Sequence, residues 1–112
     1  YVASCGEWTV YHSGDTMHYE GMEERLVGLG VDIALLPING RAAARRVAGN
    51  LWGDEAARLA RAIGARAVIP CHYEMFEFNT ASPQAFVDEC RKIGQGHRVL
   101  RCGGRWSSEE LG

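Results

Sequence analysis

Two kinds of apolar pattern run along the chain, one typical of strands and the other of helices. Residues 8–12 alternate large apolar side chains with polar or aromatic ones, which predicts a strand that ends before Gly14. Residues 31–38 and 67–70 are nearly continuous in apolar character, as in strands that are covered on both faces. Residues 98–101 predict a last strand.

Three further stretches repeat apolar residues at helical spacing. We expect helices over about 19–29 and over 54–63, and a third that starts with Ser82 as N-cap and Pro83 at the first helical position. The predicted buried faces are Met22, Leu26 and Leu29 in the first helix, Ala56, Leu59, Ala60 and Ile63 in the second, and Phe86, Cys90 and Ile93 in the third.

The order of these elements indicates the fold class. Strand, helix, strand, loop, helix, strand, helix and strand predict an α/β arrangement with helices packed on a sheet. The length of 112 residues suits one domain. Residues 39–53 are the least regular part and carry Arg41, Arg45 and Arg46 around several alanines. Because the chain starts with Tyr1, almost at the start of a strand, we interpret it as a piece of a longer protein.

Composition argues against two classes of partner. Twelve basic and fourteen acidic residues give a net charge of −2, which offers no electrostatic case for binding nucleic acid or an anionic membrane. No apolar run approaches the length of a membrane span. The four cysteines lack Cys-x-x-Cys spacing, so we expect reduced thiols in a cytoplasmic protein, with Cys90 and Cys102 buried as small apolar residues.

Two polar segments directly follow predicted strands. Asp15 belongs to a Ser-Gly-Asp-Thr segment after the first strand, and His72 belongs to a Pro-Cys-His-Tyr segment after the strand at 67–70. Taken singly, Asp15 is explained by turn chemistry and His72 by structural hydrogen bonding. However, a carboxylate can bridge two cations and an imidazole can complete a coordination shell. Active sites of α/β folds collect at strand ends, so these two residues could converge, although two ligands by themselves do not make a metal site.

With their surroundings, these segments resemble the metallo-β-lactamase superfamily and, within it, the branch of L-ascorbate-6-phosphate lactonases. The resemblance runs from about Tyr11 to Trp106. It is carried by residues 11–16 (Tyr-His-Ser-Gly-Asp-Thr), 32–40 (Asp-Ile-Ala-Leu-Leu-Pro-Ile-Asn-Gly) and 68–73 (Val-Ile-Pro-Cys-His-Tyr), with a Gly-Gly pair before an aromatic residue near the end.

The resemblance implies a layered fold and a shared metal centre. Residues 1–106 would form the C-terminal portion of an αββα sandwich, and residues 107–112 a polar tail. Asp15 would be the carboxylate that bridges two metals, and His72 the last histidine ligand of the second metal. The family's His-x-His-x-Asp-His cluster has no match in this chain. The chain alone is therefore expected to bind metal weakly and to be inactive.

For the complete protein, the resemblance implies a metal-dependent hydrolase. Two divalent ions, zinc or manganese with iron also allowed, would activate a water that opens a lactone such as a phosphorylated sugar-acid lactone. One alternative is a phosphodiesterase or phosphate-ester hydrolase that uses the same metals. The other is a non-catalytic fragment that packs against a partner.

Five further residues are candidates around this site. Asn39, Arg41 and Asn50 lie on the irregular loop and are candidate substrate contacts, with Arg41 suited to a phosphate. A solvated, short helical turn explains Arg41 as well. Thr16 and Tyr73 are candidates for orienting the two ligands, although ordinary hydrogen bonding explains them too.

The remaining expectations concern the pocket wall and partners. Residues 76–79 (Phe-Glu-Phe-Asn) either line one wall of a pocket or pack their two phenylalanines into the core. The partner implied by the resemblance is a small-molecule substrate, with neither nucleic acid nor membrane involved. The intact protein is expected to be a homo-oligomer.

Overall fold

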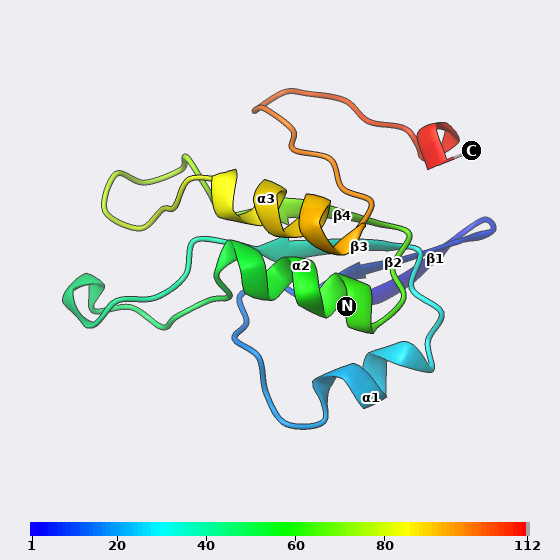
Figure 1. Cartoon of the computed structure of the whole chain (residues 1–112), viewed down its shortest axis with the longest axis horizontal. Coiled ribbons are helices and arrows are strands. Elements are labelled where there is room, and N and C mark those ends of the chain that lie inside the picture. The colour runs from blue at the N-terminus through cyan, green and yellow to red at the C-terminus, as the bar shows by residue number, and fades with distance from the viewer. Residues whose placement is uncertain (112) are drawn as a thin grey trace.

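One four-stranded sheet organises residues 1–111, the part of the chain that the computed structural model describes (Figure 1). The strands are β1 (Val2–Cys5), β2 (Trp8–His12), β3 (Ile33–Pro37) and β4 (Ala67–Cys71), in this order across the sheet. β1 and β2 form an antiparallel hairpin, whereas β2, β3 and β4 run parallel. The predicted mixed α/β architecture is confirmed.

The parallel register decides which chain segments meet. Tyr11 pairs with Ala34, and Ala34 pairs with Val68 on the next strand. Because β2, β3 and β4 run in the same direction, the segments that follow them all emerge at one edge of the sheet. The segments that contain Asp15 and His72 therefore leave the sheet on the same side.

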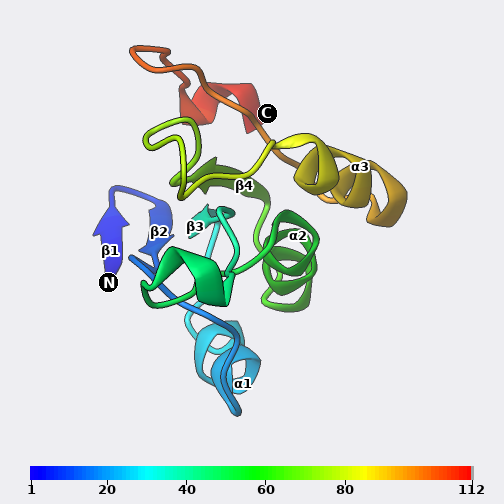
Figure 2. The same cartoon turned by 90° about the vertical axis from the view of Figure 1, so that its left-hand side faces the viewer.

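Three helices cover one face of this sheet, as Figure 2 shows. They are α1 (Met22–Val27), α2 (Gly53–Ala62) and α3 (Gln84–Ile93). The core between them and the sheet contains fully buried side chains from every layer, including Met22, Leu36, Leu51, Val68 and Phe86. Two short 3-10 helices, Ala43–Arg45 and Ser108–Leu111, lie in the loops. Gly112, at the end of the predicted polar tail, lies outside the described residues.

The first helix is shorter than predicted. α1 spans six residues instead of about eleven, and Leu29 is 50% exposed instead of buried. Gly28 caps the helix and Gly30 takes a left-handed backbone with φ of 62°, so Leu29 lies on the turn into β3. The third helix starts at Gln84, with the Gln84 amide donating to Ser82 Oγ (3.2 Å).

Two predictions about strands were wrong. Residues 98–101 form no strand, because only a single bridge joins His97 to Val68. Cys102, predicted to be buried there, is exposed, whereas Cys90 is buried as expected. The opposite error concerns β1, which sequence analysis missed. All four of its residues are exposed at the sheet edge, so they carry no apolar alternation.

The helices of the described residues are unsuited to crossing a membrane. Among residues 1–111, no helix combines the length and the apolar character needed to cross a bilayer.

The second face of the sheet is only partly covered. Trp8, Val10 and Leu35 share this face and remain half-buried. Ser108 lies beside Trp8 at one end of it. Apolar strand faces and an open edge such as β1 favour association with other chains.

We predict that the 112-residue chain self-associates through this face, which sedimentation velocity at several concentrations measures. Leu35→Lys should shift the chain towards monomer, because association would have to desolvate the new ammonium group. Leu29→Lys adds the same charge at a site that is already exposed on the helical side, and it should change association little. A monomeric wild-type chain with a sharp thermal transition would contradict this prediction.

Candidate metal centre

Asp15 is placed by the turn that follows β2. The Ser13 amide donates to the Leu35 carbonyl (3.2 Å), which extends the contact between β2 and β3 past the end of the strand. The Gly14 amide then donates to His12 Nδ1 (3.0 Å), and Gly14 adopts a left-handed backbone. This turn leaves the Asp15 side chain 70% exposed at the carboxyl edge of the sheet.

His72 comes to the same place from the end of β4. The Ile38 amide donates to the Cys71 carbonyl (3.1 Å), which holds the chain beside β3 up to the residue before His72. His72 has a left-handed backbone, with φ of 60°, which is uncommon for a residue with a β-carbon. Its Nε2 lies 3.6 Å from Asp15 Oδ1. Two residues that are far apart in sequence therefore present a carboxylate and an imidazole to one point.

The donor types and their separation fit a shared divalent cation. Two ligands at about 2.0–2.2 Å from a tetrahedral metal lie about 3.3–3.6 Å apart. The observed 3.6 Å is at the upper end of that range. His72 Nδ1 is buried and has no hydrogen-bond partner among the described residues. Within residues 1–111, no group of three or more His, Cys, Asp or Glu side chains surrounds one point, so this chain supplies two donors.

Asn50 is a buried residue that makes a hydrogen bond to Asp15. Asn50 is 2% exposed, and its Nδ2 donates to Asp15 Oδ1 (3.4 Å). Its segment is tied to the Asp15 turn, because the Leu51 amide donates to the Thr16 carbonyl (2.9 Å). Of the three candidate substrate contacts, Asn50 is the one that reaches the Asp15–His72 pair.

Arg41 makes contacts that sequence analysis did not anticipate. Its guanidinium donates to both carboxylate oxygens of Glu55 (2.7 and 3.1 Å) and to the Asn50 carbonyl (3.1 Å). The Arg41 hydrogen bonds hold the pKa of Glu55 below its usual value of 4.5. Glu55 also accepts from the Trp52 amide (2.8 Å) at the start of α2. The guanidinium is thus engaged in fixing the loop.

Arg45 joins the two loops that flank the candidate centre. It donates to the Asn39 carbonyl (2.5 Å) and to the Thr80 carbonyl (3.0 Å), and its guanidinium lies 5.7 Å from the centroid of the Trp52 ring. Asn39 is completely buried and donates to Asn79 Oδ1 (2.9 Å). Sequence analysis missed this role because nothing in the local pattern distinguishes Arg45 from its neighbours.

Gly40 is needed for the same loop to close. Its φ is 68°, and a β-carbon there would lie 2.1 Å from the nearest atom of the Trp52 ring. Both the left-handed backbone and the close indole exclude a side chain.

Thr16 and Tyr73 use their hydroxyl groups on the backbone. Thr16 Oγ1 donates to the Met17 carbonyl (2.8 Å), and the Tyr73 hydroxyl donates to the Leu100 carbonyl. Burial raises the pKa of Tyr73 and that of the neighbouring Cys71 thiol. Both groups therefore stay protonated at neutral pH.

The aromatic residues after His72 lie at the surface. Phe76 and Phe78 are 50% and 64% exposed, so core packing does not explain them. The Phe76 ring centroid lies 6.4 Å from that of His72 and 6.1 Å from that of Phe78. These rings form an apolar surface next to the candidate metal ligand.

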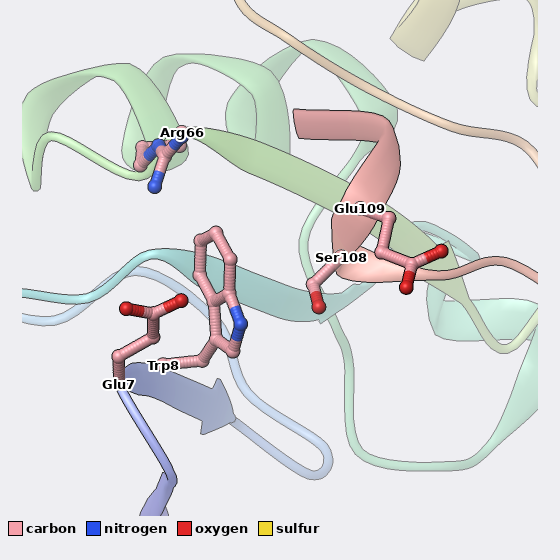
Figure 3. Close-up of a pocket in the computed structure, with 5 residues that line it drawn as sticks. All are labelled: Glu7, Trp8, Arg66, Ser108 and Glu109. Atoms are coloured by element: carbon pink, nitrogen blue, oxygen red, sulfur yellow. The ribbon is translucent and has the colours of Figure 1, made fainter. Parts of the chain in front are cut away.

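A separate hollow of about 490 Å³ lies at the opposite end of the strands. Figure 3 shows the residues that line it: Glu7, Trp8, Arg66, Ser108 and Glu109. The Arg66 guanidinium lies 4.8 Å from the centroid of the Trp8 ring. Because Trp8 starts β2 and Arg66 precedes β4, this hollow is remote from Asp15 and His72.

Comparison with known proteins identifies one family. The model of the beta-lactamase superfamily domain matches residues 1–73, a span that contains both Asp15 and His72. A protein of Rubrobacter xylanophilus called UPF0173 metal-dependent hydrolase is 40% identical over 87 residues, which cover 76% of this chain and 32% of the relative. The chain spans about a third of the length of the curated relatives that it matches first.

Two solved structures share the fold. Igni18, described as a novel metallo hydrolase from the archaeon Ignicoccus hospitalis, is 26% identical with a TM-score of 0.68, and the match covers 88% of this chain and 40% of Igni18. The metallo-beta-lactamase fold protein YhfI from Bacillus subtilis has a TM-score of 0.70 at 17% identity, over 94% of this chain and 42% of YhfI. The latter similarity bears on the fold alone.

The Arg41–Glu55 pair predicts how stability depends on pH. Because the pKa of Glu55 is lowered in the folded state, its stabilisation is present above the unfolded value and is lost as the pH falls through the folded value. Glu55→Gln should cost about 0.5–1 kcal/mol at pH 7, since Arg41 is 41% exposed and screened. The variant should also show a shallower loss of stability below about pH 4.5 than wild type.

Chemical denaturation between pH 3 and pH 7 measures this dependence. Glu110→Gln is a suitable control, because Glu110 pairs with Arg98 near the C-terminus, away from the loop. Equal acid dependence in wild type and Glu55→Gln would show that the pair does not stabilise the loop.

Proposed function

Because this chain belongs to the beta-lactamase superfamily domain family, we propose that it is part of a metal-dependent hydrolase in which Asp15 and His72 are metal ligands. The observation that carries the proposal is the 3.6 Å approach of Asp15 Oδ1 and His72 Nε2 at the carboxyl edge of β2 and β4. The names of the relatives, which are metal-dependent hydrolases, support the same activity.

The complete centre holds two divalent ions in this proposal, zinc or manganese with iron also allowed. Asp15 would be the ligand shared by both ions, and His72 would be a ligand of one of them. The other ligands come from sequence outside these 112 residues. The two-donor count within residues 1–111 and the greater length of the relatives support this division. Catalytic zinc sites generally need three protein ligands, so two donors hold metal weakly.

A bound metal pair would supply the chemistry of an activated water and a polarised scissile bond. The residues of this chain perform the remaining tasks. The Asp15 carboxylate would accept a hydrogen bond from the attacking group, and its negative charge would lower the repulsion between two cations. Arg45 keeps the loops at 39–52 and 72–80 at a fixed distance from each other. Phe76 and Phe78 form an exposed apolar surface beside His72 that would contact an apolar part of the substrate.

The substrate we propose is a lactone, with a phosphorylated sugar-acid lactone as the first candidate. Support comes from the resemblance of residues 11–16, 32–40 and 68–73 to the lactonase branch. Arg41 is engaged with Glu55, so a phosphate group would need another cationic contact. The complete protein is proposed to be a cytoplasmic homo-oligomer that acts on small molecules.

Replacing Asp15 tests the metal centre in the complete protein. Asp15→Asn keeps the size of the side chain but removes the charge that holds two cations together. Metal content should fall from two ions per chain towards one, and hydrolysis should fall by at least about 100-fold. His72→Ala should weaken one ion and leave the other in place.

Elemental analysis of the purified variants, together with circular dichroism, measures these effects. His18→Ala is a control, because the His18 ring contacts Glu23 at α1 instead of the proposed ligands or the turn that carries Asp15. Full metal occupancy and wild-type hydrolysis in Asp15→Asn would show that Gly14 and Asp15 only form a turn.

Substrate class is tested separately. We expect the complete protein to hydrolyse a sugar-acid lactone with a kcat/KM at least about 10-fold above that for a phosphodiester such as bis-p-nitrophenyl phosphate. Phe76→Ala should raise KM for the preferred substrate. The reverse ranking of the two substrates would overturn the lactone assignment and leave the metal centre intact.

A further inference from the structure

We infer that Asn50 is a positioning residue, which holds the Asp15 carboxylate in the orientation needed to bind metal. This inference rests on the proposed role of Asp15 and adds a residue that acts through it. The placement of the Asn50 backbone, the burial of its amide and the hydrogen bonds that fix it support this role.

The backbone of Asn50 is held on both sides. Its amide donates to the Gly40 carbonyl (3.0 Å), and its carbonyl accepts from Arg41 Nη1 (3.1 Å). The following residue, Leu51, donates its amide to the Thr16 carbonyl (2.9 Å), and its carbonyl accepts from the Gly40 amide (2.9 Å). These hydrogen bonds therefore hold the segment around Asn50 in place against the turn that carries Asp15.

The side chain of Asn50 is oriented by Asp15. Its Nδ2 donates to Asp15 Oδ1 (3.4 Å), and the reverse orientation would place two acceptor oxygens against each other. Its Oδ1 is buried and has no hydrogen-bond partner among residues 1–111. A buried amide with an unpaired oxygen lowers the stability of the fold, so a leucine of similar size would be favoured if packing were the sole requirement.

Burial also separates this role from substrate binding. Asn50 is 2% exposed, whereas the Asp15 side chain is 70% exposed. Because solvent hardly reaches the Asn50 side chain, this side chain contacts Asp15 from the interior of the protein. The same oxygen of Asp15 that accepts from Asn50 is the one 3.6 Å from His72 Nε2. Asn50 therefore controls where that oxygen lies relative to the second ligand.

The support extends outward to α2. Asn50 is joined through its carbonyl to Arg41, and Arg41 is joined to Glu55 in the first turn of the helix. Glu55 accepts from the Trp52 amide, which closes the loop onto the helix. A rigid helix thus fixes the position of a loop residue that supports a metal ligand. Preorganised ligands bind metal more tightly because less conformational freedom is lost on binding.

Asn50→Leu in the complete protein tests the inference, with zinc as the probe. The substitution removes the donor, keeps the volume and eliminates the unpaired oxygen. We expect the dissociation constant for the weaker zinc ion to rise about 10-fold, as expected for loss of an outer hydrogen bond to a ligand. We also expect the melting temperature of the metal-free protein to be unchanged or higher. A purely structural residue would instead lower the melting temperature and leave zinc affinity unchanged.

Gln95→Leu is the matched control. Gln95 is also a buried amide, at 4% exposure, but its Nε2 donates to the Ala65 carbonyl (2.9 Å) before the start of β4. It should lower the melting temperature without changing zinc affinity, which separates loss of stability from loss of positioning. Wild-type zinc affinity in Asn50→Leu would overturn the inference.

A measurement on the metal-free protein covers the case in which Asn50→Leu fails to fold. The Asn50 side-chain NH₂ should exchange slowly with solvent in wild type and at least several-fold faster in Asp15→Ala. Equal exchange rates would overturn the inference. If Asp15→Asn leaves zinc binding unchanged, the proposed function itself fails and the role of Asn50 falls with it. If Asp15→Asn weakens binding but Asn50→Leu does not, only the positioning role fails.

Discussion

The parallel pairing of β2, β3 and β4 is the constraint on which the candidate centre depends. Parallel strands send their following segments to the same edge of the sheet, so the turn after β2 and the loop after β4 emerge side by side. Asp15 and His72 meet at 3.6 Å because of this arrangement, although half of the chain lies between them. If β4 ran antiparallel to β2, the segment that contains His72 would leave the sheet at the opposite edge.

The loop at 39–52 restricts the conformation of the segments at the carboxyl edge of the sheet, which the strand ends alone would leave flexible. Its shape depends on Arg41 and Arg45, which bind carbonyl groups and a carboxylate within the protein. It also depends on Gly40, which lets the chain approach the Trp52 ring. The loop buries Asn39 and Asn50, each with an oxygen that has no partner among the described residues. Such costs are common where a structure positions functional groups instead of maximising stability.

The two faces of the sheet differ in how completely they are covered. One face is covered by α1, α2 and α3, whose apolar residues form the core with Ala34, Leu36 and Val68. The other carries half-buried Trp8, Val10 and Leu35. The chain spans about a third of the length of its first relatives, and an apolar face of this kind is suited to a second layer. The aromatic side chains beside His72 add a further apolar surface next to the candidate centre.

The amino-acid sequence by itself determined the strand or helix periodicity of elements such as β2 and α2. It also showed which two residues, Asp15 and His72, are of metal-ligand type. The bounds of β2 and the buried face of α2 follow from local alternation and helical spacing, which are properties of neighbouring residues. The tertiary structure alone decided what lacks a local signal. β1 is an exposed edge strand, residues 98–101 lack a strand partner, and Arg41 forms an ion pair with Glu55. The convergence of Asp15, His72 and Asn50 belongs to this second group, because it depends on strand order and register, which act between residues distant in sequence.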